Sequence, residues 1–143
     1  MDIRGLQHSD LDFWTLMETR WRDMDSLSHI NHTAYLSYME SARVDVYIQL
    51  GYSGIRRERD ESTILASMEV HYLDQTIHPS KLEIGHRISR VGNKSFDFLA
   101  GIFHAENKNL ICSAIFKLVA YSYKDECTIP VTQFIIERCR PIE

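Results

Sequence analysis

The chain lacks the features that mark secreted, disulfide-bonded or zinc-ribbon proteins. Its three cysteines, Cys112, Cys127 and Cys139, are odd in number and have no CxxC spacing. Such cysteines are typical of reduced thiols in a cytoplasm. The first ten residues carry acids and no apolar run, so we expect no signal peptide. These absences predict a cytoplasmic protein.

Long hydrophobic runs and a strong excess of positive charge are also missing. The longest apolar stretch, residues 114–120, is interrupted by Lys117, whereas a membrane helix needs about 20 apolar residues. We therefore expect no membrane span. The net charge of -4 argues against a nucleic-acid surface. The 143 residues, with 44% hydrophobic side chains and no internal repeat, predict a single domain over residues 1–143.

What is present is one helical pattern followed by several strand patterns. Residues 13–22 alternate and predict a strand. Apolar residues then recur at spacings of three and four and predict a helix of about five turns, which Asn31 or Thr33 begins and Gly51 ends. The stripe consists of Tyr35, Met39, Ala42, Val46 and Leu50, widened by Leu36 and Val44. Four further strands are predicted at residues 64–73, 81–91, 95–104 and 110–123, and a short helix at 130–138.

This order predicts an α+β fold in which one long helix lies against a curved antiparallel sheet, because that arrangement buries both apolar faces. The strand at 64–73 alternates as a half-buried strand does, and the strand at 110–123 is apolar enough to be covered on both faces. A lone sheet of this kind exposes a long edge. Pairing with a second copy would cover it, so we expect a homodimer, and a homotetramer of two dimers is equally compatible.

Generic catalytic motifs are absent: the chain has no GxGxxG, P-loop, HExxH or GxSxG. The chemistry-bearing residues are Asp23, Asp25, His29 and His32, between a strand and a helix start. Asp25, His29 and His32 are of the types that bind zinc or iron, but they lie in a loop and not on one helix face. Alternatively, the aspartates form a turn and the histidines satisfy backbone groups.

A catalytic role is another interpretation of these residues, based on their place just before a helix start. A helix start offers free N–H groups and a partial positive charge, which polarise a carbonyl and stabilise an oxyanion. A carboxylate a few residues upstream attacks that carbonyl or deprotonates a water. A thioester suits such a site, because a thiolate leaves without strong acid assistance.

The stretch RWRDMDSLSHINHTAYLSYMESAR, residues 20–43, resembles the motif of hotdog-fold acyl-CoA thioesterases of the 4-hydroxybenzoyl-CoA thioesterase type. A second stretch, VGNKSFDF at 91–98, resembles the G-x-K-S-F strand start of that family, and the element order agrees over essentially the whole chain. The residues in register with the first motif are Asp23, Asp25, His29, Asn31, Tyr35, Leu36, Tyr38, Glu40, Ala42 and Arg43.

The resemblance implies a thioester hydrolase that acts on acyl-CoA at a subunit interface, without a metal or other cofactor. Asp25 stands at the place of the catalytic carboxylate. The N–H groups near His32 and Thr33 would hold the thioester oxygen, and Lys94 and Ser95 would touch the CoA portion. The other substrate-binding positions that the motif implies are His29, Asn31 and Tyr35.

The chain departs from the family motif at two positions. Ser28 replaces a glycine, which serves a tight loop with a positive φ that serine adopts less easily. A loop of different shape would favour the alternative function, a non-catalytic module that binds acyl-CoA or an acyl-carrier partner. His32 replaces an asparagine of one subgroup, although a short-chain subgroup has histidine there. His32 then either orients Asp25 or the attacking water, or caps the helix.

Several charged residues have weaker interpretations. Asp23 is expected to be structural and paired with Arg20 or Arg22, and Glu40 is expected to pair with Arg43 along the helix. The arginines of residues 55–59 lie in a loop that either is simply solvated or meets CoA phosphates. A third function, a hotdog dehydratase acting on an acyl thioester, fits the motif placement less well.

Overall fold

The computed structural model describes residues 1–50 and 61–142. The strands are β1 (Phe13–Glu18), β2 (Glu61–Tyr72), β3 (Lys81–Val91), β4 (Ser95–His104), β5 (Leu110–Ser122) and β6 (Cys127–Thr128). The helices are α1 (His32–Gln49) and α2 (Gln133–Glu137), and three 3-10 turns are η1 (Ile3–Gly5), η2 (His8–Asp10) and η3 (Trp21–Asp23).

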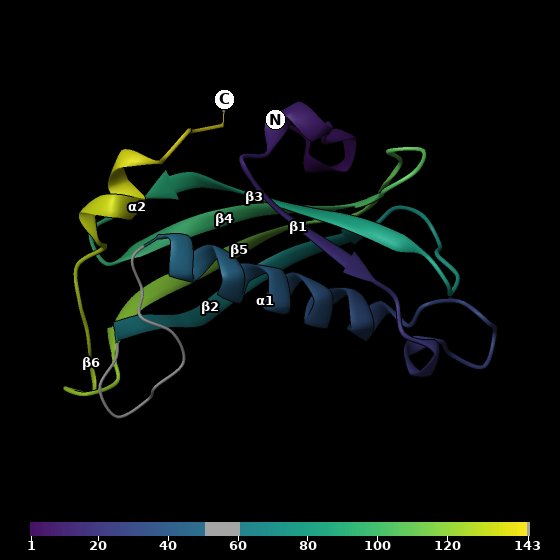
Figure 1. Ribbon diagram of the computed structural model, residues 1–143. Helices are drawn as coiled ribbons and strands as arrows, with labels where there is room; N and C mark the ends of the chain where they lie inside the picture. Colours follow the sequence, from purple (N-terminus) through teal and green to yellow (C-terminus); the bar gives the residue numbers. More distant parts are fainter. Residues whose placement is uncertain (51–60, 143) are drawn as a thin grey trace.

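The strands form one antiparallel sheet in the order β1-β3-β4-β5-β2, with β6 added beside β5. The sheet curls, and α1 lies along one face of it (Figure 1). Helix α1 contacts β1, β3 and β4. This confirms the expected α+β hotdog arrangement, in which a long helix is wrapped by an antiparallel sheet.

Helix α1 buries the predicted apolar stripe. Met39, Ala42 and Leu50 are fully buried, and Tyr35 and Val46 are nearly so. They pack on the sheet residues Phe96, Phe98, Ile84 and Phe116 in the main core. The helix starts three residues before the apolar stripe because Asn31 caps it; the expected end at Gly51 lies outside the described residues.

The opposite face of the sheet is covered by the N-terminal segment (Figure 1). Ile3, Leu6 and Leu11 pack there against Leu99 and Phe103 in a second core cluster. This explains why β5 is buried on both faces, as its apolar sequence predicted. The three cysteines are free thiols, also as expected. In the described part of the chain, no helix is both long and apolar enough to cross a membrane.

Some predicted boundaries were wrong. The first strand ends at Glu18 and not at Arg22, because the chain turns into η3 and Arg20 pairs with Asp23 across that turn. The C-terminal helix covers only Gln133–Glu137 of the predicted residues 130–138. By contrast, β3 and β4 have the predicted bounds. Strand β2 begins earlier than expected, at Glu61.

Strand β2 is an edge of the sheet and carries exposed apolar side chains. A bulge between Leu65 and Ser67 leaves Ala66 without a partner in the register with β5. The bulge shifts the alternation, so that Leu65 and Met68 both oppose core residues of β5 and lie on the α1 side. Leu65 is 43% exposed and Met68 50% exposed. The half-buried strand that the alternation predicted is therefore more exposed than expected, because nothing in the described chain covers this edge.

Candidate active site

The loop that precedes α1 is closed by its own backbone. Met24 and Ile30 form an isolated antiparallel bridge. Inside it, the Asp25 N–H donates to the His29 carbonyl at 2.7 Å, and the Ser28 N–H donates to the Asp25 carbonyl at 3.1 Å. These bonds hold residues 25–29 in a tight turn directly before the helix.

Ser28 has a φ of 65° within this turn. This is the left-handed conformation that favours glycine, the residue of the family motif at this place. The serine has therefore kept the glycine-like backbone conformation. The departure at Ser28 does not change the handedness of the loop at this residue.

The Asp25 carboxylate is held by the same turn. Its Oδ1 accepts hydrogen bonds from the Leu27 N–H at 2.9 Å and from the His29 N–H at 3.3 Å. Its Oδ2 accepts no hydrogen bond from the described residues, and the side chain is exposed. One oxygen therefore orients the carboxylate, while the other remains open for chemistry.

The start of α1 provides a backbone N–H donor in the same cavity as Asp25. Asn31 is the N-cap, and its Oδ1 accepts hydrogen bonds from the Thr33 N–H and the Thr33 hydroxyl, both at 3.0 Å. Asn31 thus fills the capping role that was one alternative for His32. Because the Thr33 N–H is already used, the His32 N–H is the donor of this pair that has no acceptor among the described residues.

A cavity of about 210 Å³ lies between the turn, the helix start and the end of β2. The Tyr35 hydroxyl is buried and forms no hydrogen bond of good geometry with the described residues. Burial raises the pKa of Tyr35, and Thr76 beside the hydroxyl opposes this shift. The His32 ring packs edge-on against Tyr72, with ring centroids 5.8 Å apart. The lining residues are Asp25, Leu27, His29, Ile30, His32, Tyr35, Tyr72, Asp74 and Gln75.

The structure thus brings together Asp25, His29, His32 and Tyr35 of the predicted site residues, with Asn31 and Thr33 at the adjoining helix start. Two further lining residues, Leu27 and Ile30, belong to the turn itself. The sequence also gave no indication of Tyr72, Asp74 and Gln75. They come from the end of β2 and the loop after it, and no motif marks them. The strand order alone could have indicated them, because it places the end of β2 beside the start of α1.

Asp23 has a different role from Asp25. Its Oδ2 accepts a hydrogen bond from the Tyr38 hydroxyl at 2.6 Å and one from Arg20 Nε at 2.9 Å. Burial raises the pKa of Asp23, but these hydrogen bonds outweigh it and leave the pKa lowered. The expected pairing with Arg20 is confirmed, and Asp23 serves to fix the turn to the helix.

Two predicted substrate-binding residues, Lys94 and Ser95, do not line the Asp25 cavity. Lys94 is exposed in the hairpin between β3 and β4, and Ser95 Oγ accepts a hydrogen bond from Arg90 at 3.0 Å. Ser95 pairs with Val119, which pairs with Ile64 at the far end of β2 from Tyr72. Within one subunit, Lys94 and Ser95 are therefore remote from Asp25. The arginines of residues 55–59 lie outside the described residues.

Two further expectations concern charge and metal. No ion pair joins Glu40 to Arg43 in the described residues, so that prediction was wrong. The Arg43 guanidinium instead lies over the Phe116 ring, 4.5 Å from its centroid.

Over residues 1–50 and 61–142, no group of three or more His, Cys, Asp or Glu side chains is arranged to hold a metal ion.

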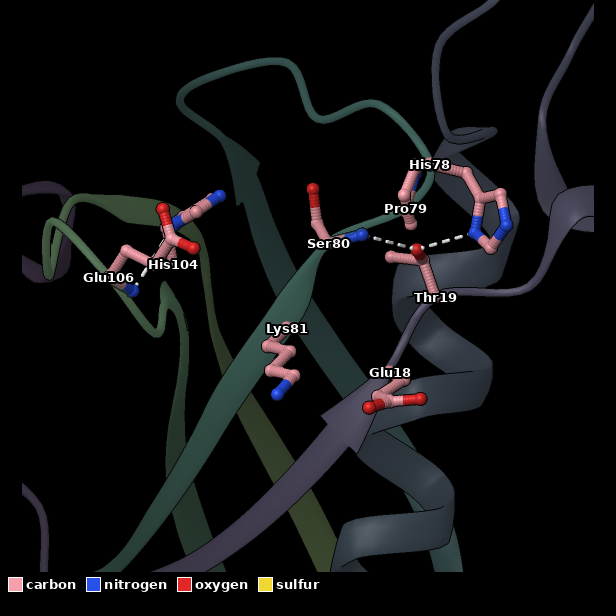
Figure 2. Close-up of a pocket in the computed structure, with 8 residues that line it drawn as sticks. All are labelled: Glu18, Thr19, His78, Pro79, Ser80, Lys81, His104 and Glu106. Atoms are coloured by element: carbon pink, nitrogen blue, oxygen red, sulfur yellow. Dashed lines mark hydrogen bonds between the residues drawn. The ribbon is translucent and has the colours of Figure 1, made fainter.

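A separate cavity of about 360 Å³ lies at the end of the sheet, between the loop before β3 and the hairpin after β4. Figure 2 shows Thr19 between His78 and Ser80 on one side, with His104 and Glu106 on the other. The Thr19 hydroxyl bonds His78 Nδ1 at 2.8 Å and accepts from the Ser80 N–H at 2.9 Å. This cavity contains none of the predicted site residues, and on its other side the Glu106 N–H donates to His104 Nδ1 at 3.3 Å.

Comparisons with known proteins agree with this fold and motif. Residues 19–138 match the Thioesterase-like superfamily. No curated protein matches the chain. Among solved structures, the PA2801 protein of Pseudomonas aeruginosa, a proposed thioesterase, is 27% identical, with a TM-score of 0.79 over 89% of this chain and 97% of that one.

Two more distant structures show the same fold. A Thermus thermophilus thioesterase complexed with coenzyme A and Zn is 24% identical over 90% of this chain and 97% of that one, with a TM-score of 0.76. The DHNA-CoA thioesterase of Staphylococcus aureus is 20% identical over 82% and 79%, with a TM-score of 0.72. The family match spans most of the chain and includes the turn and helix that form the cavity. The chain therefore belongs to the Thioesterase-like superfamily.

Proposed function

We propose that the protein is a cytoplasmic acyl-CoA thioesterase of the 4-hydroxybenzoyl-CoA thioesterase type. The observation that carries this proposal is the Asp25 carboxylate, which two N–H groups orient beside the open N–H of His32 at the start of α1. A base or nucleophile and an oxyanion donor thus line one cavity. Family membership and the thioesterase neighbours support the same reaction class.

The chemistry follows from these two groups. The thioester oxygen binds the His32 N–H and the positive end of the helix, which stabilise the oxyanion that forms. Asp25 either attacks the carbonyl carbon, giving an anhydride that water then hydrolyses, or removes a proton from the attacking water. In both routes the C–S bond breaks, a C–O bond forms, and the thiolate leaves as CoA with one proton. The reaction gives the free acid and uses no cofactor.

His32 and Tyr35 have supporting roles in this proposal. His32 projects from the helix start into the cavity, where its ring can orient Asp25 or the attacking water. The Tyr35 hydroxyl, which forms no hydrogen bond of good geometry with the described residues, is available to a polar group of the substrate. His29 and Asn31 shape the turn and the cap, so they act through the position of Asp25 and of the helix N–H.

The site is incomplete within one subunit. A cavity of about 210 Å³ is small beside the 300–1,000 Å³ of typical ligand pockets. The edge strand β2, with its exposed Leu65, Met68 and Tyr72, is the surface on which a second copy would bind. Antiparallel pairing of two β2 strands about an axis at Ser67 would set Tyr72 opposite Ser62 of the partner subunit.

Such a homodimer also gives Lys94 and Ser95 a place in substrate binding. They lie at the Ile64 end of the sheet, which the two-fold axis carries toward the Asp25 cavity of the other subunit. The coenzyme A complex of the Thermus thermophilus thioesterase supports CoA as the carrier of the acyl group. We propose that CoA crosses the subunit interface toward Lys94 and Ser95. A tetramer of two dimers is compatible with the same site.

The test is hydrolysis of a panel of acyl-CoA esters, followed by thiol release. Asp25→Asn should lower kcat by about 100-fold or more, while stability stays the same because the Asn oxygen still accepts from Leu27 and His29. Asp2→Asn, which changes an exposed aspartate outside the cavity, is the matched control. Equal rates in wild type and Asp25→Asn would refute the role of Asp25. Binding of acyl-CoA without any thiol release would favour the non-catalytic module.

A further inference from the structure

Helix α1 carries a buried cation, Arg43. Arg43 is only 7% exposed, and no carboxylate of the described residues pairs with it. Its guanidinium lies over the Phe116 ring, and its Nη1 is buried without a hydrogen-bond partner in the described chain. Buried charges are normally paired and hydrogen-bonded, because removal from water is costly. The described residues therefore leave the charge of Arg43 without a neighbouring anion.

Neighbouring groups do not supply that anion. Glu40, one turn earlier on α1, is exposed to solvent and forms no ion pair with Arg43 within the described residues. His86 lies nearby in the core, fully buried. Burial and the charge of Arg43 lower the pKa of His86 to about 3, so His86 is neutral and adds no second cation. Tyr47 accepts a hydrogen bond from Arg43 but supplies no negative charge. Among the described residues, no anion therefore balances the charge of Arg43.

Arg43 lines a cavity, which we call the Arg43 pocket, of about 280 Å³. Val44, Leu65 and Leu118 give it apolar walls. On the polar side, the Thr63 hydroxyl donates to the Tyr47 hydroxyl at 2.7 Å and joins β2 to α1. The described residues that line it are Glu40, Arg43, Val44, Tyr47, Ser62, Thr63, Leu65 and Leu118.

This arrangement suits a short alkyl chain that ends in a carboxylate. The alkyl part would contact the apolar walls, and the planar guanidinium matches the two oxygens of a carboxylate. Among the described residues, Glu40 is the one acid in the lining, and its exposed charge is screened by water. The Arg43 pocket therefore suits a ligand that has one anionic group at the end of an apolar part.

We propose that the Arg43 pocket binds the distal carboxylate of an ω-carboxyacyl thioester, the substrate class that the enzyme prefers. This inference rests on the proposed function and on the β2 pairing described with it. Within one subunit, Arg43 lies about 16 Å along the helix from His32, at 1.5 Å per residue. Across the β2 interface, the Ser62 end of one strand lies beside the Tyr72 end of the other. The Arg43 pocket of one subunit then faces the Asp25 cavity of its partner.

The test compares two five-carbon substrates, pentanoyl-CoA and its carboxylated analogue glutaryl-CoA. We expect a higher kcat/KM for glutaryl-CoA in the wild type. Arg43→Gln should lower the ratio of the two kcat/KM values by about 30-fold or more, because it leaves the carboxylate without its cation. Arg43→Lys, which keeps the charge, should retain part of the preference. Arg4→Gln removes an exposed arginine and should leave the ratio unchanged.

A second measurement separates this inference from the proposed function. Calorimetry with glutarate, with pentanoate as the control, probes the Arg43 pocket without catalysis. If neither ester is hydrolysed, the proposed function fails, yet glutarate binding that Arg43→Gln abolishes would still support the carboxylate site. Equal substrate ratios in wild type and Arg43→Gln, or glutarate binding no stronger than that of pentanoate, would overturn it. So would a weaker dimer with an unchanged ratio, since the anion would then come from the second copy.

Discussion

The Tyr38 hydroxyl donates a 2.6 Å hydrogen bond to Asp23. This bond connects the second turn of α1 to the end of η3, two residues before Asp25. Arg20 approaches the same carboxylate oxygen from η3. The turn that carries Asp25 is therefore attached to the helix whose start provides the proposed oxyanion donor.

Removal of this hydrogen bond should destabilise the protein. We expect Tyr38→Phe to lower the free energy of unfolding by about 1.5–3 kcal/mol, because the acceptor is a charged, part-buried carboxylate. Tyr35→Phe is the control, since the buried Tyr35 hydroxyl forms no hydrogen bond of good geometry with the described residues and its loss should cost little. Urea unfolding of both variants measures the difference. Equal losses in the two variants would contradict this account.

Asp23 should also make stability depend on pH. Its pKa is lowered in the folded state by the hydrogen bonds from Tyr38 and Arg20, which outweigh burial. The ionised group therefore stabilises the fold above the ordinary aspartate pKa of about 3.9. This stabilisation is lost as the pH falls through the lower folded-state pKa.

We expect the difference in unfolding free energy between wild type and Asp23→Asn to be constant near neutral pH. It should shrink as the pH falls below about 4. Other carboxylates titrate equally in both proteins, so their contributions cancel. Urea titrations at a series of pH values provide the measurement. A difference that stays constant down to pH 2 would show that Asp23 is not stabilised in its ionised form.

Ser28 offers a test of the turn. Glycine adopts a positive φ without the steric penalty that serine has at 65°. We expect Ser28→Gly to raise the free energy of unfolding by about 0.5–1 kcal/mol. Ser26→Gly is the matched control, because Ser26 does not have a positive φ and its replacement should be neutral or destabilising. A loss of stability in Ser28→Gly would mean that the serine side chain itself supports the turn.

The β2 edge predicts the oligomeric state. We expect Met68→Lys to convert a dimer to a monomer and to lower thioesterase activity with it, because a charge on this edge opposes strand pairing. Leu16→Lys places the same charge on β1, the opposite edge, where Leu16 is 76% exposed. Sedimentation velocity of both variants distinguishes the two edges. Dissociation by Leu16→Lys but not by Met68→Lys would place the interface on β1.

The sequence predicted the fold well where local chemistry decides the structure. The bounds of β3 and β4 were correct because a short Gly-Asn-Lys turn separates two apolar strands. The stripe of α1 was correct because its period follows from packing on one face. The first strand was too long because the alternation continues through Arg22, whereas the ion pair between Arg20 and Asp23 stabilises a 3-10 turn.

The sequence predicted only those residues of the candidate site that lie close together in the chain. Asp25, His29 and His32 are near one another in the sequence, so one motif identifies them. Tyr72 reaches the same cavity through the strand order, which no local pattern encodes. Arg43 was expected to pair with Glu40 because the two lie one turn apart, but spacing does not show that the guanidinium is buried against Phe116.

Ala66, the extra residue in β2, changes which residues of the strand can work together. Without it, a strict alternation would point Leu65 and Met68 to opposite sides of the sheet. With it, the Arg43 pocket, which Leu65 lines, and the Asp25 cavity, which Tyr72 lines, open on the same face of one strand. A single extra residue thus places the proposed substrate-selecting pocket and the proposed hydrolytic cavity on one face of β2. Its deletion would separate them without altering any side chain in either site.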